Sequence, residues 1–222
     1  MIPLKDENPS RTFPFFTITL IVANILIYIY QTSLGSSDTE LFVMQMAAVP
    51  YEIVHMTDIH QKSAVPIPLT ILTAMFIHGG LLHLGGNMLY LWIFGNNIED
   101  ALGHFRFIIF YSLCGILATA LHITSAPDST TPLIGASGAI AGILGAYLLL
   151  YPRAKVHTLF IFIVIIKIIR IPAFVVLTLW FLIQVANSSS LEAGVAWYAH
   201  IGGFVAGVLL IKPFRRKKKP GR

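Results

Sequence analysis

Long apolar stretches separated by short polar segments dominate the chain. A helix that crosses a lipid bilayer needs about 20 predominantly apolar residues, and several of these stretches approach that length. The expected spans lie near residues 13–31, 82–98, 105–123, 136–151, 172–187 and 196–212. The pattern therefore predicts an all-α integral membrane protein with six transmembrane helices.

Two further apolar segments are too short to cross. Residues 41–56 and 66–77 are interrupted by Pro50, Pro66 and Pro68, and proline disrupts the interior of a helix. We expect them to form a long first loop lying in the membrane interface.

The segment before the fifth span is ambiguous. Residues 156–187 are apolar except for Lys167 and Arg170, yet thirty-two residues are too few for two full crossings. Residues 156–170 are therefore expected to be an interfacial or re-entrant piece that leads into the span.

Composition agrees with membrane residence. Of the 222 residues, 56% are hydrophobic and 11% are charged, whereas soluble domains carry about 25% charged residues. The spans leave no room for a sizeable second domain. We expect one membrane domain over 13–212, a cytoplasmic segment over 1–12 and a basic cytoplasmic tail over 213–222.

The positive charges predict the orientation. With both termini in the cytoplasm, fourteen of the fifteen Lys and Arg residues fall on the inner side and only Lys62 lies outside, as the positive-inside rule requires. Seven of the fifteen lie in the last eleven residues. A nucleic-acid tail is the alternative, but a basic run directly after an apolar helix favours a membrane flank, and no nucleic-acid partner is expected.

Ser137 is the first candidate for chemistry. It lies in Gly135-Ala136-Ser137-Gly138 at the expected start of the fourth span. The partial positive charge of a helix N-terminus favours a developing anion, which suits a nucleophile that attacks a carbonyl. The alternative is helix packing by small residues, since Gly142 and Gly145 continue the same pattern.

His200 is the candidate base. Gly203 and Gly207 follow it on the same side of the sixth span, so two glycine-faced helices can approach closely and bring imidazole to the serine. A lone core histidine or a proton-relay member is the alternative. No carboxylate is placed to complete a triad, the nearest in sequence being Glu192, so the prediction is a two-residue dyad.

His83 and Asn87 are spaced i, i+4 on the second span and so share one helix face. Both side chains can donate hydrogen bonds to an oxyanion. A zinc site using His78, His83 and His200 is the alternative. No HExxH motif is present, so neither a metal nor another cofactor is expected.

The other ionisable or reactive side chains give weaker indications of function. Glu99 and Asp100, at the inner end of the second span, are expected to form a solvated helix end, with a proton relay as the alternative. Cys114 is the single cysteine; it excludes an intramolecular disulfide and is expected to be a small core residue.

At these motifs the chain resembles the rhomboid intramembrane serine proteases. The matching pieces are His78-Gly79-Gly80 through His83 and Asn87, then Gly135-Ala136-Ser137-Gly138, and finally Ala199-His200-Ile201-Gly202-Gly203. They occur in the family's order on three different spans, and the likeness extends over roughly residues 10–212. The form is that of a minimal six-helix prokaryotic member.

The resemblance implies roles for these residues. Ser137 would be the nucleophile and His200 the general base, while His83, Asn87 and the Ser137 backbone N–H would form the oxyanion hole. The implied reaction is hydrolysis of a peptide bond in or next to a transmembrane helix of a membrane-protein substrate, through an acyl-enzyme. The implied place is a plasma or inner membrane, with the site open to the extracytoplasmic side.

Two other functions remain open. One is an inactive rhomboid-like protein that binds client transmembrane helices without cutting them. The other is a small transporter or metal carrier that uses the histidines. The sequence leaves substrate and oligomeric state undetermined.

The chain departs from the family pattern in two places. Some members carry a tyrosine four residues after the serine that stacks on the histidine, and here that position is Ala141. Some also carry a Trp-Arg pair in the first loop, whereas residues 32–77 contain neither Trp nor Arg.

Overall fold

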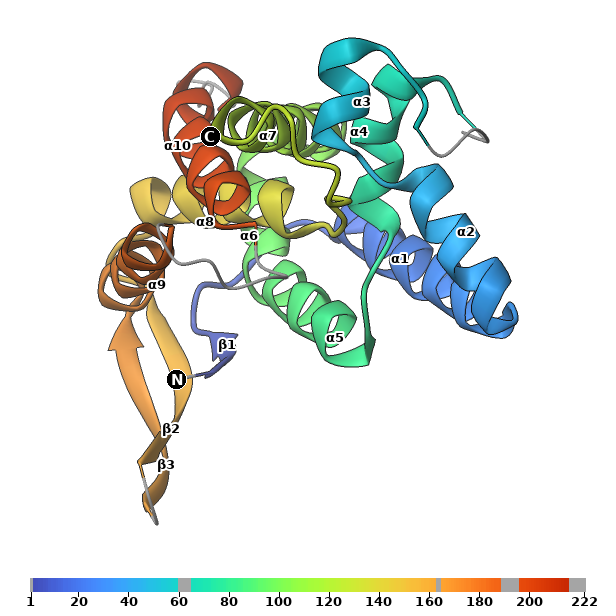
Figure 1. Cartoon of the computed structure of the whole chain (residues 1–222). Coiled ribbons are helices and arrows are strands. Elements are labelled where there is room, and N and C mark those ends of the chain that lie inside the picture. The colour runs from blue at the N-terminus through green and yellow to red at the C-terminus, as the bar shows by residue number, and fades with distance from the viewer. Residues whose placement is uncertain (1, 60–64, 163–164, 189–195, 216–222) are drawn as a thin grey trace.

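The computed structural model describes residues 2–59, 65–162, 165–188 and 196–215. Helices make up most of it, and they surround a short central helix that begins at Ser137 (Figure 1). The α-helices are α1 (Phe15–Ser33), α2 (Ser36–Met46), α3 (Pro50–His55), α4 (Thr70–Thr73), α5 (Leu81–Tyr90), α6 (Asn96–Leu102), α7 (His104–Ser125), α8 (Ser137–Leu150), α9 (Ala173–Asn187) and α10 (Trp197–Phe214). Two 3₁₀ turns, η1 (Ile67–Leu69) and η2 (Ala74–Phe76), flank α4, and a π-helical turn, η3 (Leu91–Gly95), joins α5 to α6.

Three described helices, α1, α7 and α10, are long and apolar enough to cross a membrane. A fourth candidate is the pair Ile67–Phe76 and Leu81–Leu102, which is bent by 83°. The helices α8 and α9 are apolar but shorter. Each expected span coincides with a helix or a run of helices within a few residues. The chain is therefore a multi-pass membrane protein, and its described residues contain three to four candidate spans by length and composition.

A three-stranded antiparallel sheet corrects the all-α prediction. Its strands are β1 (Ile2–Asp6), β2 (Lys155–Phe162) and β3 (Ile165–Pro172), in the order β1-β2-β3. Thr158 pairs with Ile169 across the hairpin, which projects away from the helices (Figure 1). The hairpin occupies the segment that we expected to be an interfacial or re-entrant piece. Ten of the sixteen residues 156–171 are Val, Ile or Thr. Their β-branched side chains favour strand over helix.

The N-terminal strand is also held by side chains of the helices. The carboxylate of Asp6 accepts a hydrogen bond from the Tyr147 hydroxyl at 2.5 Å and another from the Asn97 amide at 3.0 Å. Tyr147 is on α8 and Asn97 on α6, so β1 connects the sheet to both helices. Burial raises the pKa of Asp6 above its ordinary 3.8, against the opposing effect of the Tyr147 hydrogen bond.

Backbone packing between α8 and α10 forms the centre of the molecule. A methyl group added to Gly203 would overlap the carbonyl oxygen of Gly138, and one added to Gly207 would overlap that of Gly142. Only glycine permits so close an approach. This packing fixes the start of α8 relative to the first turns of α10.

Glu99 corrects the expectation of a solvated helix end. Its side chain is fully buried and accepts hydrogen bonds from the N–H groups of Phe16 and Thr17 and from the Thr17 hydroxyl, at 2.7–2.9 Å. The distance from His104 Nδ1 to Glu99 Oε1 is 2.6 Å. The first N–H groups of a helix have no partner within it. Glu99 thus caps α1 from a position more than 80 residues later in the chain.

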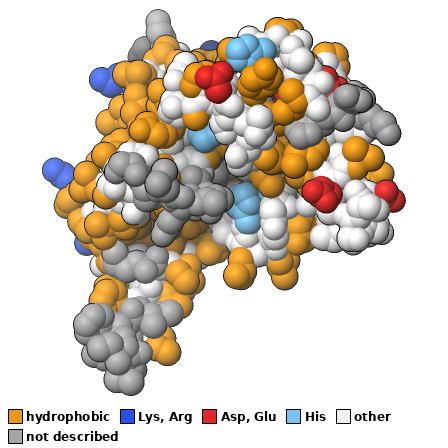
Figure 2. Space-filling view, in the orientation of Figure 1, with side chains coloured by type: hydrophobic (Ala, Val, Ile, Leu, Met, Phe, Trp, Pro, Cys, Tyr) orange, Lys and Arg blue, Asp and Glu red, His pale blue; other side chains and the backbone are white. Residues whose placement is uncertain are grey.

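The outer surface is largely apolar. Large exposed side chains include Val22, Ile109, Trp92 and Leu209. Figure 2 shows hydrophobic side chains over much of one face, with the visible Lys and Arg side chains mostly along the left edge. Such a surface suits lipid rather than water.

Candidate active site

Ser137 and His200 lie in direct contact although 63 residues separate them. The distance from Ser137 Oγ to His200 Nε2 is 2.8 Å. Ser137 is the first residue of α8, and His200 lies one turn into α10. The glycine packing of these two helices brings the side chains together.

Gly135 shapes the backbone that leads into Ser137. Its φ of 114° lies in a region that favours glycine. A Cβ there would lie 2.8 Å from His83 Nε2 and 3.7 Å from the Asn87 amide nitrogen. The absence of a side chain therefore allows His83 and Asn87 of α5 to lie against the backbone that precedes the serine.

The four predicted site residues, His83, Asn87, Ser137 and His200, line one cavity of about 1000 Å³. His83 and Asn87 enter it from α5, Ser137 from α8 and His200 from α10. Asn87 is 8% exposed, and its amide nitrogen has no hydrogen-bond partner among the described residues. An unpaired buried donor is costly, and this one belongs to a residue that lines the same cavity as Ser137.

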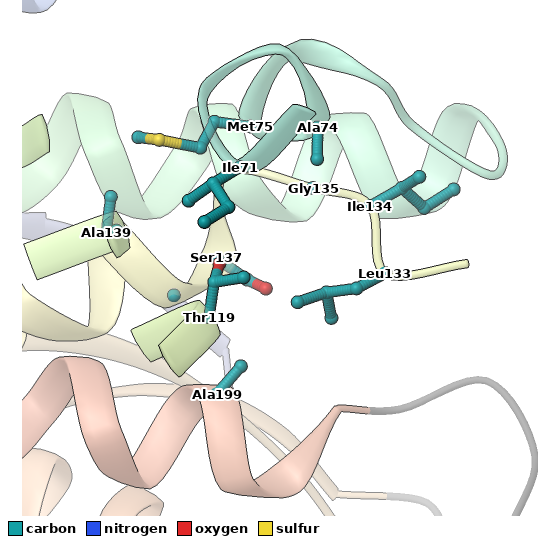
Figure 3. A pocket seen from close by; sticks show the side chains of 12 residues that line it. Ile71, Ala74, Met75, Thr119, Leu133, Ile134, Gly135, Ser137, Ala139 and Ala199 are labelled. Atoms are coloured by element: carbon teal, nitrogen blue, oxygen red, sulfur yellow. The ribbon is translucent and has the colours of Figure 1, made fainter. Parts of the chain in front are cut away.

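A second, much smaller space of about 20 Å³ borders Ser137 on another side. In Figure 3 the Ser137 and Thr119 side chains lie together in the middle, with Ile71 and Met75 above and Ala199 below. The space has room for about one water molecule. Its two hydroxyls are the polar side chains among the residues that line it.

Three side chains that the sequence did not single out surround His200. Gln184 Oε1 of α9 lies 2.7 Å from His200 Nδ1. The rings of Trp180 and Trp197 lie 5.7 and 6.3 Å from the imidazole centroid. Gln184 follows Trp180 by one helical turn. This spacing predicts that the two side chains share a face of the helix, but it does not predict which helix or residue packs against that face.

The remaining histidines in the described part of the chain do not gather around a common point. His78 is fully buried; both its ring nitrogens lack partners among the described residues, and its ring packs edge-on against His83 at 5.0 Å. Within the described ranges, no three His, Cys, Asp or Glu side chains converge as a metal requires. His122, which carried no signal in the sequence, lines the cavity. Glu192 lies outside the described residues.

Comparison with known proteins identifies rhomboid relatives of this chain. The model of the Rhomboid domain matches residues 68–217. This range includes the four predicted site residues. The chain is 32% identical over 158 residues to Rhomboid protein 1, mitochondrial, of Saccharomyces cerevisiae, covering 67% of this chain and 42% of that protein. It is 31% identical over 201 residues to Rhomboid protease GluP of Bacillus subtilis, covering 90% of this chain and 34% of that protein. It is 29% identical over 216 residues to Rhomboid protease AarA of Providencia stuartii, covering 87% of this chain and 70% of that protein. The chain thus spans less than half the length of the first two.

Proposed function

The chain belongs to the rhomboid family, and on that premise we propose that it is an intramembrane serine endopeptidase. Its substrates are membrane proteins, cleaved in or next to a transmembrane helix. Ser137 is the nucleophile and His200 the general base. The observation that carries the proposal is the 2.8 Å approach of Ser137 Oγ to His200 Nε2 at the wall of a large cavity.

The proposed chemistry has two steps. The Ser137 hydroxyl gives its proton to His200 Nε2 as Oγ bonds to the substrate carbonyl carbon, and His200 then protonates the leaving amine as the peptide bond breaks. Water next attacks the acyl-enzyme and gives its proton to His200. The acid is released, and Ser137 recovers its proton.

The oxyanion of each tetrahedral intermediate is held by three donors. They are the Ser137 N–H at the start of α8, the Asn87 amide and His83. Donors aimed at the developing charge in a site shielded from bulk water contribute most to such catalysis. The unpaired Asn87 amide nitrogen supports this assignment.

We further propose six spans with both termini in the cytoplasm. These are α1, the run from α5 to α6, then α7, α8, α9 and α10, in a membrane domain over 13–212. The fourteen residues of α8 span about 21 Å, less than the ~30 Å hydrocarbon core. Its first residue, Ser137, is therefore recessed below the extracytoplasmic surface of a plasma or inner membrane, and water reaches it through the cavity.

A fluorophosphonate probe tests the nucleophile without knowledge of the substrate. The probe phosphonylates an activated serine, forming an O–P bond and releasing fluoride. In liposomes we expect labelling of the unmodified protein, none of Ser137→Ala, and a large loss in His200→Ala. Ser33→Ala removes an exposed serine outside the cavity and should label normally. Equal labelling of Ser137→Ala would refute the assignment. An inactive client-binding protein predicts no labelling of any variant.

A further inference from the structure

We propose that Gln184 is a positioning residue for His200, taking the place of the carboxylate that a catalytic triad would supply. The inference rests on the proposed function, because it concerns the same base. It also answers what orients the imidazole in a chain that has Ala141 where some relatives carry a stacking tyrosine.

The orientation of the Gln184 amide is fixed by its own helix. Its nitrogen donates to the backbone carbonyl oxygen of Trp180 at 3.0 Å. A carbonyl oxygen can only accept, so the reversed amide would set two oxygens against each other. The amide oxygen must therefore be the atom that faces His200.

This orientation determines the tautomer of His200. An amide oxygen is also only an acceptor, so the Nδ1 atom 2.7 Å away must carry the proton. In the neutral ring Nε2 then has a free lone pair, and it is this atom that lies 2.8 Å from Ser137 Oγ. The chain of contacts from Trp180 through Gln184 prepares the imidazole to accept the serine proton.

Burial makes the contact effective. Gln184 is 5% exposed, so little water competes for the Nδ1 proton. The Trp180 ring, tilted by 39° against the imidazole, and the Trp197 ring at 89° limit its rotation. A neutral amide also avoids placing a second ionisable group inside the membrane, where an unpaired carboxylate would be costly.

Two variants separate the hydrogen bond from simple packing. Gln184→Met keeps the shape and removes the acceptor, whereas Gln184→Glu keeps an acceptor. We expect the rate of fluorophosphonate labelling in liposomes to fall by about 10- to 100-fold in Gln184→Met. Gln184→Glu should stay within about tenfold of the unmodified protein, with the acidic limb of its pH–rate profile about one unit higher, because a carboxylate favours protonated imidazole.

A matched control is available on another helix. Asn24 is a fully buried amide on α1 whose nitrogen also donates to the carbonyl four residues earlier, at 2.8 Å, and it is not among the residues lining the cavity. Asn24→Leu should leave both rate and pH profile unchanged. The other titratable side chains that line the cavity, His83, Tyr90 and His122, are present in every variant, so a shift confined to Gln184→Glu arises from its pairing with His200.

The tautomer gives a readout that does not depend on activity. With ¹⁵N-labelled histidine in lipid bilayers, the His200 signals, identified by their loss in His200→Ala, should show a protonated Nδ1 and an unprotonated Nε2. Gln184→Met should lose this preference. A protonated Nε2 in the unmodified protein would overturn the inference, as would unchanged tautomer and rate in Gln184→Met. Absence of labelling in the unmodified protein would instead refute the proposed function, and the ¹⁵N result would still decide the role of Gln184.

Discussion

At the scale of single residues, some buried polar atoms of the cavity have no hydrogen-bond partner among the described residues. Asn87 is the clearest case, because its amide nitrogen is buried without a partner among the described residues. This unsatisfied donor lies in the wall of the same cavity as Ser137, which is why we propose that it binds the oxyanion. Glu99 is the opposite case, a buried carboxylate surrounded by donors.

Asn87→Ala should impair catalysis more than binding. Removing one oxyanion donor lowers kcat by about 10²- to 10³-fold, while KM changes little. Steady-state cleavage of a fluorogenic transmembrane peptide measures both. A rise in KM with unchanged kcat would mean that Asn87 binds substrate rather than stabilising the oxyanion.

Glu99→Gln should destabilise the fold. The amide replaces one acceptor oxygen with a donor that faces the N–H groups of α1, at a cost of about 1–3 kcal/mol for the buried groups left unsatisfied. A thermal melt in detergent should show a lower Tm. Asp100→Asn is the control, because Asp100 accepts one exposed hydrogen bond, from Thr12, and its loss should change the Tm little.

At the scale of elements, the helices and the glycine-faced contact between α8 and α10 were predictable, whereas the hairpin and the side chain that contacts His200 Nδ1 were not. Apolar length located α7 and α8 within two residues of their ends, because lipid requires continuous apolar helices. The hairpin β2–β3 escaped the prediction because periodicity alone cannot distinguish a short apolar helix from a strand; the many β-branched residues of 156–171 were the signal that could have identified it. Gln184 escaped too: its importance depends on a histidine sixteen residues later that reaches it only through the packing of α9 on α10.

The α8–α10 contact predicts the effect of added volume. Gly203→Val should separate the two helices and lower stability by about 1–3 kcal/mol. The separation should also abolish fluorophosphonate labelling, because it moves His200 away from Ser137. Gly85→Ala is the matched control on α5, where a Cβ would meet nothing within 4 Å. Full labelling of Gly203→Val would contradict the proposed dependence on this contact.

The docking of β1 predicts a pH effect. Because the pKa of Asp6 is raised in the folded protein, its contribution to stability is greatest below pH 3.8 and declines as pH rises through the raised value, where a buried carboxylate must ionise. Asp6→Asn removes this titration. The Tm of the variant relative to the unmodified protein should therefore increase with pH above 3.8 in detergent melts. A pH-independent difference would contradict the burial of this carboxyl group.

At the scale of the whole molecule, a largely apolar exterior surrounds a cavity whose wall includes the catalytic pair we propose. Among the described residues, three helices, or four if the bent pair is one span, are long and apolar enough to cross a membrane, and we propose that the short α8 recesses its first residue. Six crossings with cytoplasmic termini would place the cavity mouth on the opposite side from the basic tail, of which Arg216 onward lies outside the described residues.

Direct analysis of products from a transmembrane substrate is the most decisive measurement. The protein is incubated in liposomes with single-span peptides that carry glycine near the outer end of the apolar segment, and the fragments are identified by mass spectrometry. The account predicts new termini inside or beside the apolar segment with the unmodified protein and none with Ser137→Ala. Cleavage that persists in Ser137→Ala, or cuts confined to peptide segments far from the membrane, would contradict it.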